Sequence, residues 1–194
     1  PLQTTSATDR DNAGQAGDIA INSLTGDVLI ADDINTQSTA INNAGSGGDV
    51  AIQASNGSII TNVISTASDA ELDSASNGGN ISGSVGDISL TARDDITTKD
   101  LKTFSQAESN AGNGGDISLS TSDGNISTSA LTSISNALST GTSLNGGDIS
   151  LTASGNIDVS DIQSSSFAEN DTGNGGNIFI ESSTGEILID DISS

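Results

Sequence analysis

Short segments of this chain alternate between apolar and polar positions, and the same alternation returns six times. In residues 147–162 the apolar side chains are Ile149, Leu151, Ile157, Val159 and Ile162, with small or polar residues between them. A period of two with many β-branched residues predicts half-buried strands. Helical periodicity and two-residue hairpin signals are both missing, so the strands are expected to belong to a repeating coil.

The six units are self-similar at a spacing of roughly 30 residues. They open at Gly17, Gly48, Gly86, Gly115, Gly147 and Gly176, which lie 31, 38, 29, 32 and 29 residues apart. Such a period is typical of a solenoid, in which each unit contacts only its neighbours. The heptapeptide 79–85 accounts for the longest interval and is expected to protrude as a loop or to add a strand fragment.

Apolar residues at equivalent places in successive units are expected to stack in columns inside one narrow tube. The first strand contributes the column Ile19, Val50, Ile88, Ile117, Ile149 and Ile178. The second strand contributes Val28, Ile59, Ile96, Ile126, Ile157 and Ile187. Because one coil buries too little apolar surface to offset its conformational entropy, the coils are expected to depend on one another.

A third segment in each unit has small residues at alternate places and variable residues between them. The small residues of its first five copies are Thr36/Ser38/Ala40, Thr66/Ser68/Ala70, Thr103/Ser105/Ala107, Ser133/Ser135/Ala137 and Ser164/Ser166/Ala168. We expect these positions to face inward, which makes a third strand. The predicted fold is all-β: a right-handed parallel β-helix of about six coils, with three strands per coil.

Residues 1–194 are expected to form a single β-solenoid segment. The chain begins at Leu2 and stops at Ile192 in the same phase of the repeat, and no atypical capping unit is recognisable at either end. Solenoid ends usually need such caps. The sequence therefore predicts a slice of a longer array.

The charge balance is strongly acidic and restricts the partners. The chain has 4 basic and 26 acidic residues, a net charge of −22, and no Cys, His, Trp or Tyr. This charge should repel nucleic acid, and no apolar run is long enough to cross a bilayer. Composition alone would also suit a disordered chain, but the regular strand pattern argues for a folded one. Catalysis is not expected, because every candidate carboxylate pair repeats like a structural position.

One acidic column is the candidate site. Its residues follow the glycine that opens each unit: Asp18, Asp49, Asp87, Asp116, Asp148 and, in the last unit, Asn177. In one interpretation each carboxylate accepts hydrogen bonds from turn N–H groups and stays hydrated. In the other, the aspartates bind Ca²⁺ along the column or at the nearby Asp27, Asp95 and Glu186, since Ca²⁺ prefers oxygen ligands.

Two further groups of residues are weaker candidates. Acidic residues near the end of the second strand are interpreted as a solvated face balanced by Lys99 and Lys102. Phe104, Phe167 and Phe179 are expected to face outward, where they would contact a sugar, a neighbouring fibre or a covering loop.

The repeated Gly-Gly-Asp-Ile-Ser-Leu-Thr-Ala, followed by Gly-Asn-Ile, resembles the repeat regions of filamentous-haemagglutinin-like exoproteins. These are large bacterial surface proteins, many of them cyanobacterial, and the resemblance covers essentially the whole chain. It implies a β-helical fibre exported by two-partner secretion, although the family's Asn-Pro secretion motifs are not found here, where Pro1 is the only proline. We therefore expect an extracellular or cell-surface structural and adhesive shaft, with homotypic fibre contacts or a surface receptor or carbohydrate as partner. The alternative is a calcium-binding solenoid module that mediates surface contacts.

Overall fold

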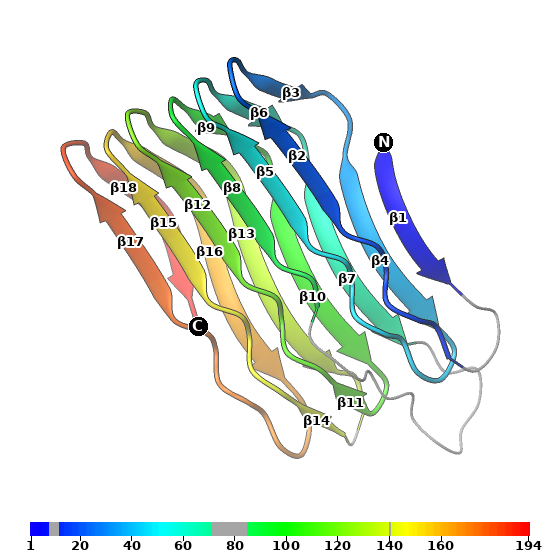
Figure 1. Cartoon of the computed structure of the whole chain (residues 1–194). Coiled ribbons are helices and arrows are strands. Elements are labelled where there is room, and N and C mark those ends of the chain that lie inside the picture. Colours follow the sequence, from blue (N-terminus) through cyan, green and yellow to red (C-terminus); the bar gives the residue numbers. More distant parts are fainter. Residues whose placement is uncertain (8–11, 71–84, 140) are drawn as a thin grey trace.

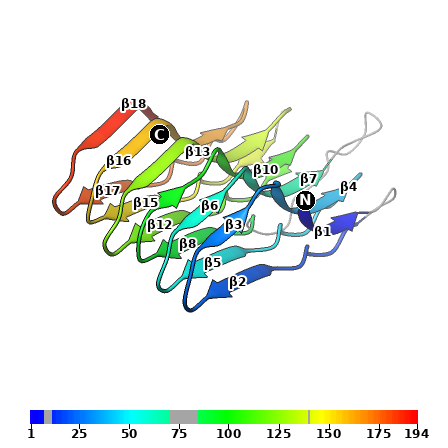
Figure 2. The ribbon, with the colours of Figure 1, turned by 90° about the horizontal axis from the view of Figure 1, so that it is seen from above.

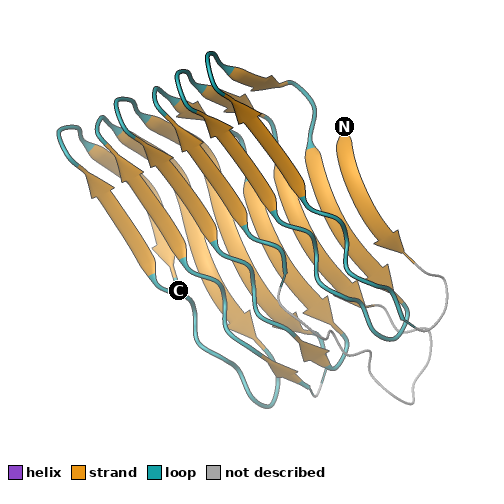
Figure 3. Cartoon of the chain, viewed as in Figure 1, coloured by secondary structure: helices purple, strands orange, loops and turns teal. Residues whose placement is uncertain are grey.

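The computed structural model describes residues 1–7, 12–70, 85–139 and 141–194, and these residues form strands and connecting turns without a helix (Figure 3). The chain runs along the front strands, crosses over at the turns and returns along the back strands while advancing toward the C terminus (Figure 1). This winding is right-handed, as is usual for parallel crossovers. Figure 2 shows successive turns lying over one another in chain order. The predicted β-helix is therefore confirmed; residues 79–84 of the insertion lie outside the described ranges.

The first strand of every turn belongs to a six-stranded parallel sheet, called the front sheet below. Its members are β2 (Ile19–Ser23), β5 (Val50–Ala54), β8 (Ile88–Ala92), β12 (Ile117–Thr121), β15 (Ile149–Ala153) and β17 (Ile178–Ser182). Each strand pairs with the strand one turn away, and equivalent residues are partners, as with Ile117 and Ile149. One strand per turn gives the six turns expected from the repeats.

The second and third segments share a ten-stranded sheet. In the early turns they are separate strands: β1 (Leu2–Ala7), β3 (Val28–Ile30), β4 (Ile34–Ala40), β6 (Ile59–Thr61), β7 (Ile64–Ala70), β9 (Ile96–Thr97) and β10 (Leu101–Ala107). Later they fuse into β13 (Ile126–Ala137), β16 (Ile157–Phe167) and β18 (Ile187–Ser193). The three predicted strands of a coil are thus present as three faces, and in the later turns the second and third run on as one continuous strand through the corner at Ala130 and Asp161.

The apolar columns form the core, and consecutive members are strand partners throughout. Ile88, Ile117, Ile149, Ile126 and Ile157 are buried. Consecutive members of the second-strand column are also strand partners, including the last two, Ile157 and Ile187. Two predicted core residues, Ile178 and Ile187, are exceptions.

Ile187 is in register with Ile157 but is 47% exposed. It lies in the last turn, whose strand β18 pairs on one side only, with β16, among the described residues, whereas Ile157 has a turn on each side. Ile178, in the same turn, is only partly buried. A residue of an apolar column is therefore fully buried only when a turn stacks on each side of it.

The small residues of the third strand face inward, as predicted. Thr36, Thr66, Thr103, Ser133 and Ser164 are fully buried. Their hydroxyls cross the interior and donate to glycine carbonyls that precede the front sheet, from Thr66 to Gly86 at 2.5 Å and from Thr103 to Gly115 at 2.7 Å. This row of hydrogen bonds ties the back of each coil to its front, because buried carbonyls need a donor.

The Gly/Asn/Ser connections also stack, which the sequence reading missed by treating them as loops. β11 (Asn110–Ala111) pairs with β14 (Thr142–Ser143), and bridges join Asn12 to Asn43 and Thr142 to Asp171. Beneath them lies a second small core of Ala40, Ala44, Ala70 and Ala107. Alanine at these places keeps this end of the tube thin.

Candidate functional site: an aspartate ladder beside a glycine-floored groove

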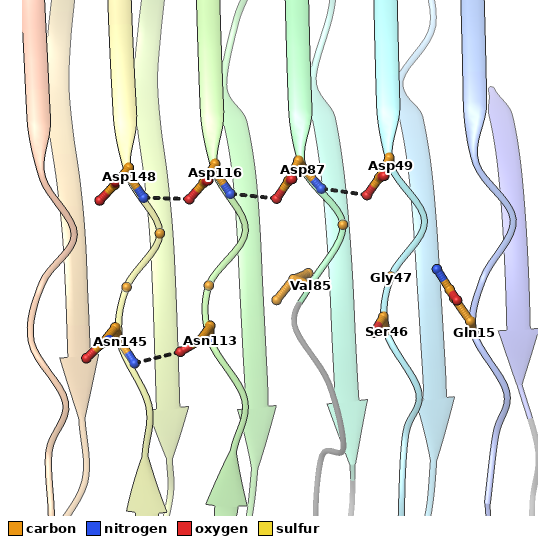
Figure 4. A pocket seen from close by; sticks show the side chains of 14 residues that line it. Gln15, Ser46, Gly47, Asp49, Val85, Asp87, Asn113, Asp116, Asn145 and Asp148 are labelled. Atoms are coloured by element: carbon orange, nitrogen blue, oxygen red, sulfur yellow. Dashed lines mark hydrogen bonds between the residues drawn. The ribbon is translucent and has the colours of Figure 1, made fainter.

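The predicted aspartate column exists and forms a ladder. Each member lies immediately before a front strand, so the turn-to-turn register of the sheet aligns the carboxylates. Oδ1 of Asp18 accepts the backbone N–H of Asp49 at 2.9 Å, and Oδ1 of Asp49 accepts that of Asp87 at 3.0 Å. The same contact continues from Asp87 to Asp116 at 2.9 Å (Figure 4).

The ladder reaches the last turn. Oδ1 of Asp116 accepts the N–H of Asp148 at 2.8 Å, and Oδ1 of Asp148 accepts both the N–H and the side-chain amide of Asn177, at 2.7 and 3.1 Å. Each carboxylate therefore caps the backbone of the next turn. The sequence predicts that these aspartates accept N–H groups of their own local turn; the observed donors belong instead to the next coil, 29 to 38 residues away.

The electrostatics of the ladder are unfavourable at its centre. Partial burial raises the pKa of Asp87 above its ordinary value of 3.8, and the charges of Asp116 and Asp49 raise it further. The hydrogen bond from the Asp116 N–H opposes this shift by favouring the charged form. Asp87 therefore holds its negative charge at a cost that the backbone hydrogen bond offsets only in part.

A parallel ladder of amides was not recognised in the sequence. Oδ1 of Asn113 accepts the N–H of Asn145 at 3.0 Å, and Oδ1 of Asn145 accepts the N–H of Asn174 at 2.9 Å. The signal was present, since each of these asparagines lies two residues before the glycine that opens a unit. Asparagine and aspartate do the same work here, because both offer Oδ1 as an acceptor.

A groove of about 480 Å³ runs between the two ladders. One wall carries Asp49, Asp87, Asp116 and Asp148, and the other carries Gln15, Ser46, Val85, Asn113 and Asn145 (Figure 4). The floor is the glycine backbone between the walls. The groove is therefore polar, open to solvent and negatively charged along one side.

Glycine is required in the floor because adjacent turns approach very closely. A Cβ on Gly115 would lie 2.3 Å from the carbonyl oxygen of Gly86, and a Cβ on Gly147 would lie 2.2 Å from that of Gly115. Any side chain would push the turns apart there. The turns can stack this closely only because a glycine opens each unit. The groove lies over these glycines because they have no side chains to fill it.

A third ladder precedes the second strand and includes the other proposed calcium ligands. Asp27 Oδ1 accepts the N–H of Ser58 at 2.9 Å, and Asp95 Oδ1 accepts the N–H of Asn125 at 2.8 Å. The N–H of Glu186 donates to Asn156 Oδ1 at 2.8 Å. Only some members of this third ladder are acidic, so its negative charges are separated by neutral residues.

The structure brings no three acidic residues of the described ranges together as a group that could hold a metal ion. Each ladder aspartate directs one oxygen to a neighbouring N–H and offers its second oxygen to the groove or to solvent. Calcium usually takes six to eight oxygen ligands, so the other ligands would have to come from water or glycine carbonyls. Calcium binding stays a prediction.

The weaker candidates are dispersed. Lys102 pairs with Asp100 at 3.0 Å, as expected for local charge balancing, and Asp32 pairs with the amino group of Pro1 at 3.2 Å. Phe167 and Phe179 face solvent, as predicted. Phe104 is half-buried and lines a shallow hollow on the outside of the third-strand face together with Ile134.

The comparisons with known proteins return no match among family models, curated proteins or solved structures. No helix in the described ranges is long and apolar enough to cross a membrane. The structure itself shows that the chain is a β-solenoid repeat protein.

Proposed function

We propose that this chain is a structural and adhesive shaft segment of a secreted or cell-surface fibrous protein. The observation that carries the proposal is the unbroken register of the stack. Equivalent residues pair from turn to turn in the front sheet, in the ten-stranded sheet and in the ladders. Such a stack adds about 4.8 Å per turn and can lengthen without changing its cross-section.

The rest of the structure is consistent with a spacer. The repeated positions are occupied by core columns, hydroxyl bridges and ladders, all of which hold one turn to the next. The likeness of the repeats to filamentous-haemagglutinin-like exoproteins favours a bacterial surface fibre, an extracellular setting and export by two-partner secretion. The adhesive part would need a receptor or a carbohydrate as its partner.

Joining two copies tests the shaft most sharply. Leu2 and Ile192 belong to the same column, since both continue the pairing of Ile34 and Ile162. A fusion of Ser194 directly to Thr5 therefore keeps the phase of the repeat. We expect one continuous stack that is about 29 Å longer, from six more turns at ~4.8 Å, and that unfolds at a higher temperature than the single chain.

The matched control joins the same two copies through a flexible Gly/Ser linker, which fixes no register between them. This fusion should behave as two tethered bodies in small-angle X-ray scattering. The shaft proposal fails if the in-phase fusion scatters and melts in the same way as the control. Adhesion is tested separately by binding of the in-phase fusion to intact cells and to immobilised polysaccharides.

The second candidate function is a calcium-binding module, and the observation that favours it is the row of carboxylates along the groove. It predicts a higher unfolding temperature in millimolar calcium than in chelator at equal ionic strength. The shaft account expects no difference beyond that produced by magnesium. Asp116→Asn keeps the Oδ1 acceptor and removes one carboxylate, so it should abolish a calcium effect that arises in the groove.

A further inference from the structure

The outer face of the front sheet carries almost no charge, although the protein as a whole is strongly acidic. Its outward residues in the first five turns are Ala20, Asn22, Ala51, Gln53, Ser89, Thr91, Ser118, Ser120, Ser150 and Thr152. Glu181 in β17 is the one charged residue at these positions. The other acidic residues lie elsewhere, and the aspartate ladder is among those that border this sheet.

The same face has a hollow near one end and a projecting side chain near the other. The hollow has a volume of about 360 Å³ and lies over the small residues Ala20 and Ala51, bordered by Asn22 and Gln53. Phe179 occupies the equivalent place in the last turn and is 53% exposed. Phe179 and Ala51 thus belong to one outward column and differ in size.

We propose that this face binds a second copy of the chain in an antiparallel, two-fold arrangement, with Phe179 of each copy in the hollow of the other. This inference rests on the proposed fibre function and specifies its lateral contact. A cavity of about 150 Å³ accommodates benzene, so the hollow is large enough for a phenyl ring. In a parallel arrangement the two phenylalanines would face each other and both hollows would stay empty.

Charge and symmetry favour a second copy over other occupants. Two copies with the same negative charge approach most easily through surfaces without charge, because repulsion opposes contact between acidic surfaces. The face is self-complementary, as a two-fold interface requires. A positively charged partner would instead be drawn to the acidic ladders.

The size of the face predicts a weak pair. Six strands at ~4.8 Å and five residues at ~3.3 Å give roughly 450 Å² per copy, or about 900 Å² in total. Specific interfaces usually begin near 1,200 Å². The chain should therefore be in reversible equilibrium between monomer and dimer, and added salt should strengthen the dimer by screening the repulsion between copies.

Sedimentation equilibrium of the full chain over a range of concentrations tests the proposal. We expect a dimer whose dissociation constant falls as sodium chloride is raised from 50 to 500 mM. Phe179→Ser, which copies the residue at position 150, should raise the dissociation constant at least tenfold. Ala51→Glu, which places a charge in the hollow, should do the same.

Phe167→Ser is the matched control, because Phe167 is 47% exposed but lies outside the front sheet. It should change the dissociation constant by less than about twofold. All variants alter exposed residues, so an unchanged unfolding temperature will show that their folds are intact. A strictly monomeric chain, or a dimer unaffected by Phe179→Ser, would overturn the proposal and leave the shaft function standing, since that depends on the in-phase fusion.

The orientation is tested with one label. The chain has no cysteine, so Thr25→Cys in the exposed turn after β2 can carry a single spin label. An antiparallel pair places the two labels near opposite ends of the dimer. Strong coupling between them would show a parallel pair and contradict the proposal.

Discussion

Thr66 and Gly86 are joined across the inside of the tube, where the threonine Oγ1 donates to the glycine carbonyl oxygen at 2.5 Å. Thr66 lies in the third strand and Gly86 opens the next unit, 20 residues later. The contact therefore closes one coil and positions the start of the following front strand. It explains why this inward place is occupied by threonine or serine in every described turn.

Thr66→Val should destabilise the protein, because valine keeps the shape and removes the donor of a buried carbonyl. We expect a loss of about 1–3 kcal/mol in the free energy of unfolding, measured by urea denaturation. Thr132→Val is the control, since Thr132 is on the outer side of its strand. An equal loss in both variants would mean that the hydroxyl bridge contributes nothing specific.

Gly115→Ala should be among the most damaging single substitutions, because its Cβ would lie 2.3 Å from the Gly86 carbonyl oxygen. We expect a loss of more than about 3 kcal/mol or failure to fold. Gly26→Ala is the matched variant, as a Cβ there has no atom within 4 Å among its neighbours. Thermal unfolding of the two proteins compares them directly, and similar melting temperatures would contradict the close stacking of turns.

Asp87→Asn should stabilise the protein at neutral pH. Folding raises the pKa of Asp87, so the ionised side chain destabilises the folded state, and this penalty fades as the pH falls through the raised pKa toward the ordinary value of 3.8. Asparagine keeps the Oδ1 acceptor without the charge. Each neighbouring carboxylate repels by about 1 kcal/mol in water, so a gain of about 1 kcal/mol is expected at pH 7.

The pH profile distinguishes this effect from a general loss of acidity. The gain from Asp87→Asn should shrink as the pH is lowered to 3.8 and below. Asp158→Asn removes an exposed carboxylate outside the ladders and should change stability by less than about 0.5 kcal/mol. A gain from Asp87→Asn that is the same at every pH would exclude the electrostatic explanation.

Ile126→Ala and Ile187→Ala compare two members of one column. Ile126 is fully buried, whereas Ile187 is 47% exposed. The first variant should lose about 2–5 kcal/mol, and the second less than about 1 kcal/mol, in urea unfolding. Comparable losses would show that the last turn is covered in solution, as it would be if another copy stacked on it.

The sequence was sufficient to predict the architecture, because the same pattern of inward and outward residues occurs in every repeat. The inward phase of Ile117 and Ile149 follows from alternation, and their stacking follows from the period. The exposure of Ile187 could not be inferred in the same way, because alternation gives the direction of a side chain and says nothing about its neighbours along the stack. Fusion of the second and third segments at Ala130 also depends on a corner geometry that residue types do not encode.

The candidate site was predicted in part. The aspartate column was evident because Asp116 and Asp148 follow equivalent glycines. Turn chemistry predicted that they accept N–H groups, but not that the donors would belong to the next coil. The amide ladder at Asn113 and Asn145 was missed because asparagine is common in loops. The groove emerges only from the stacked backbone, whose close approach no single repeat reveals.

The measurement that tests the central claim most directly is the formation of engineered disulfides between neighbouring turns. Ser127 and Asp158 are strand partners on the outer face of β13 and β16. The double variant Ser127→Cys/Asp158→Cys should therefore oxidise to an intramolecular disulfide at low protein concentration. Ser127→Cys/Ser160→Cys is displaced by two residues, about 8 Å between Cα atoms from the strand spacings, and should stay reduced because bridged Cα atoms lie within about 7 Å. The reverse result, or equal oxidation of both variants, would contradict a parallel stack in register.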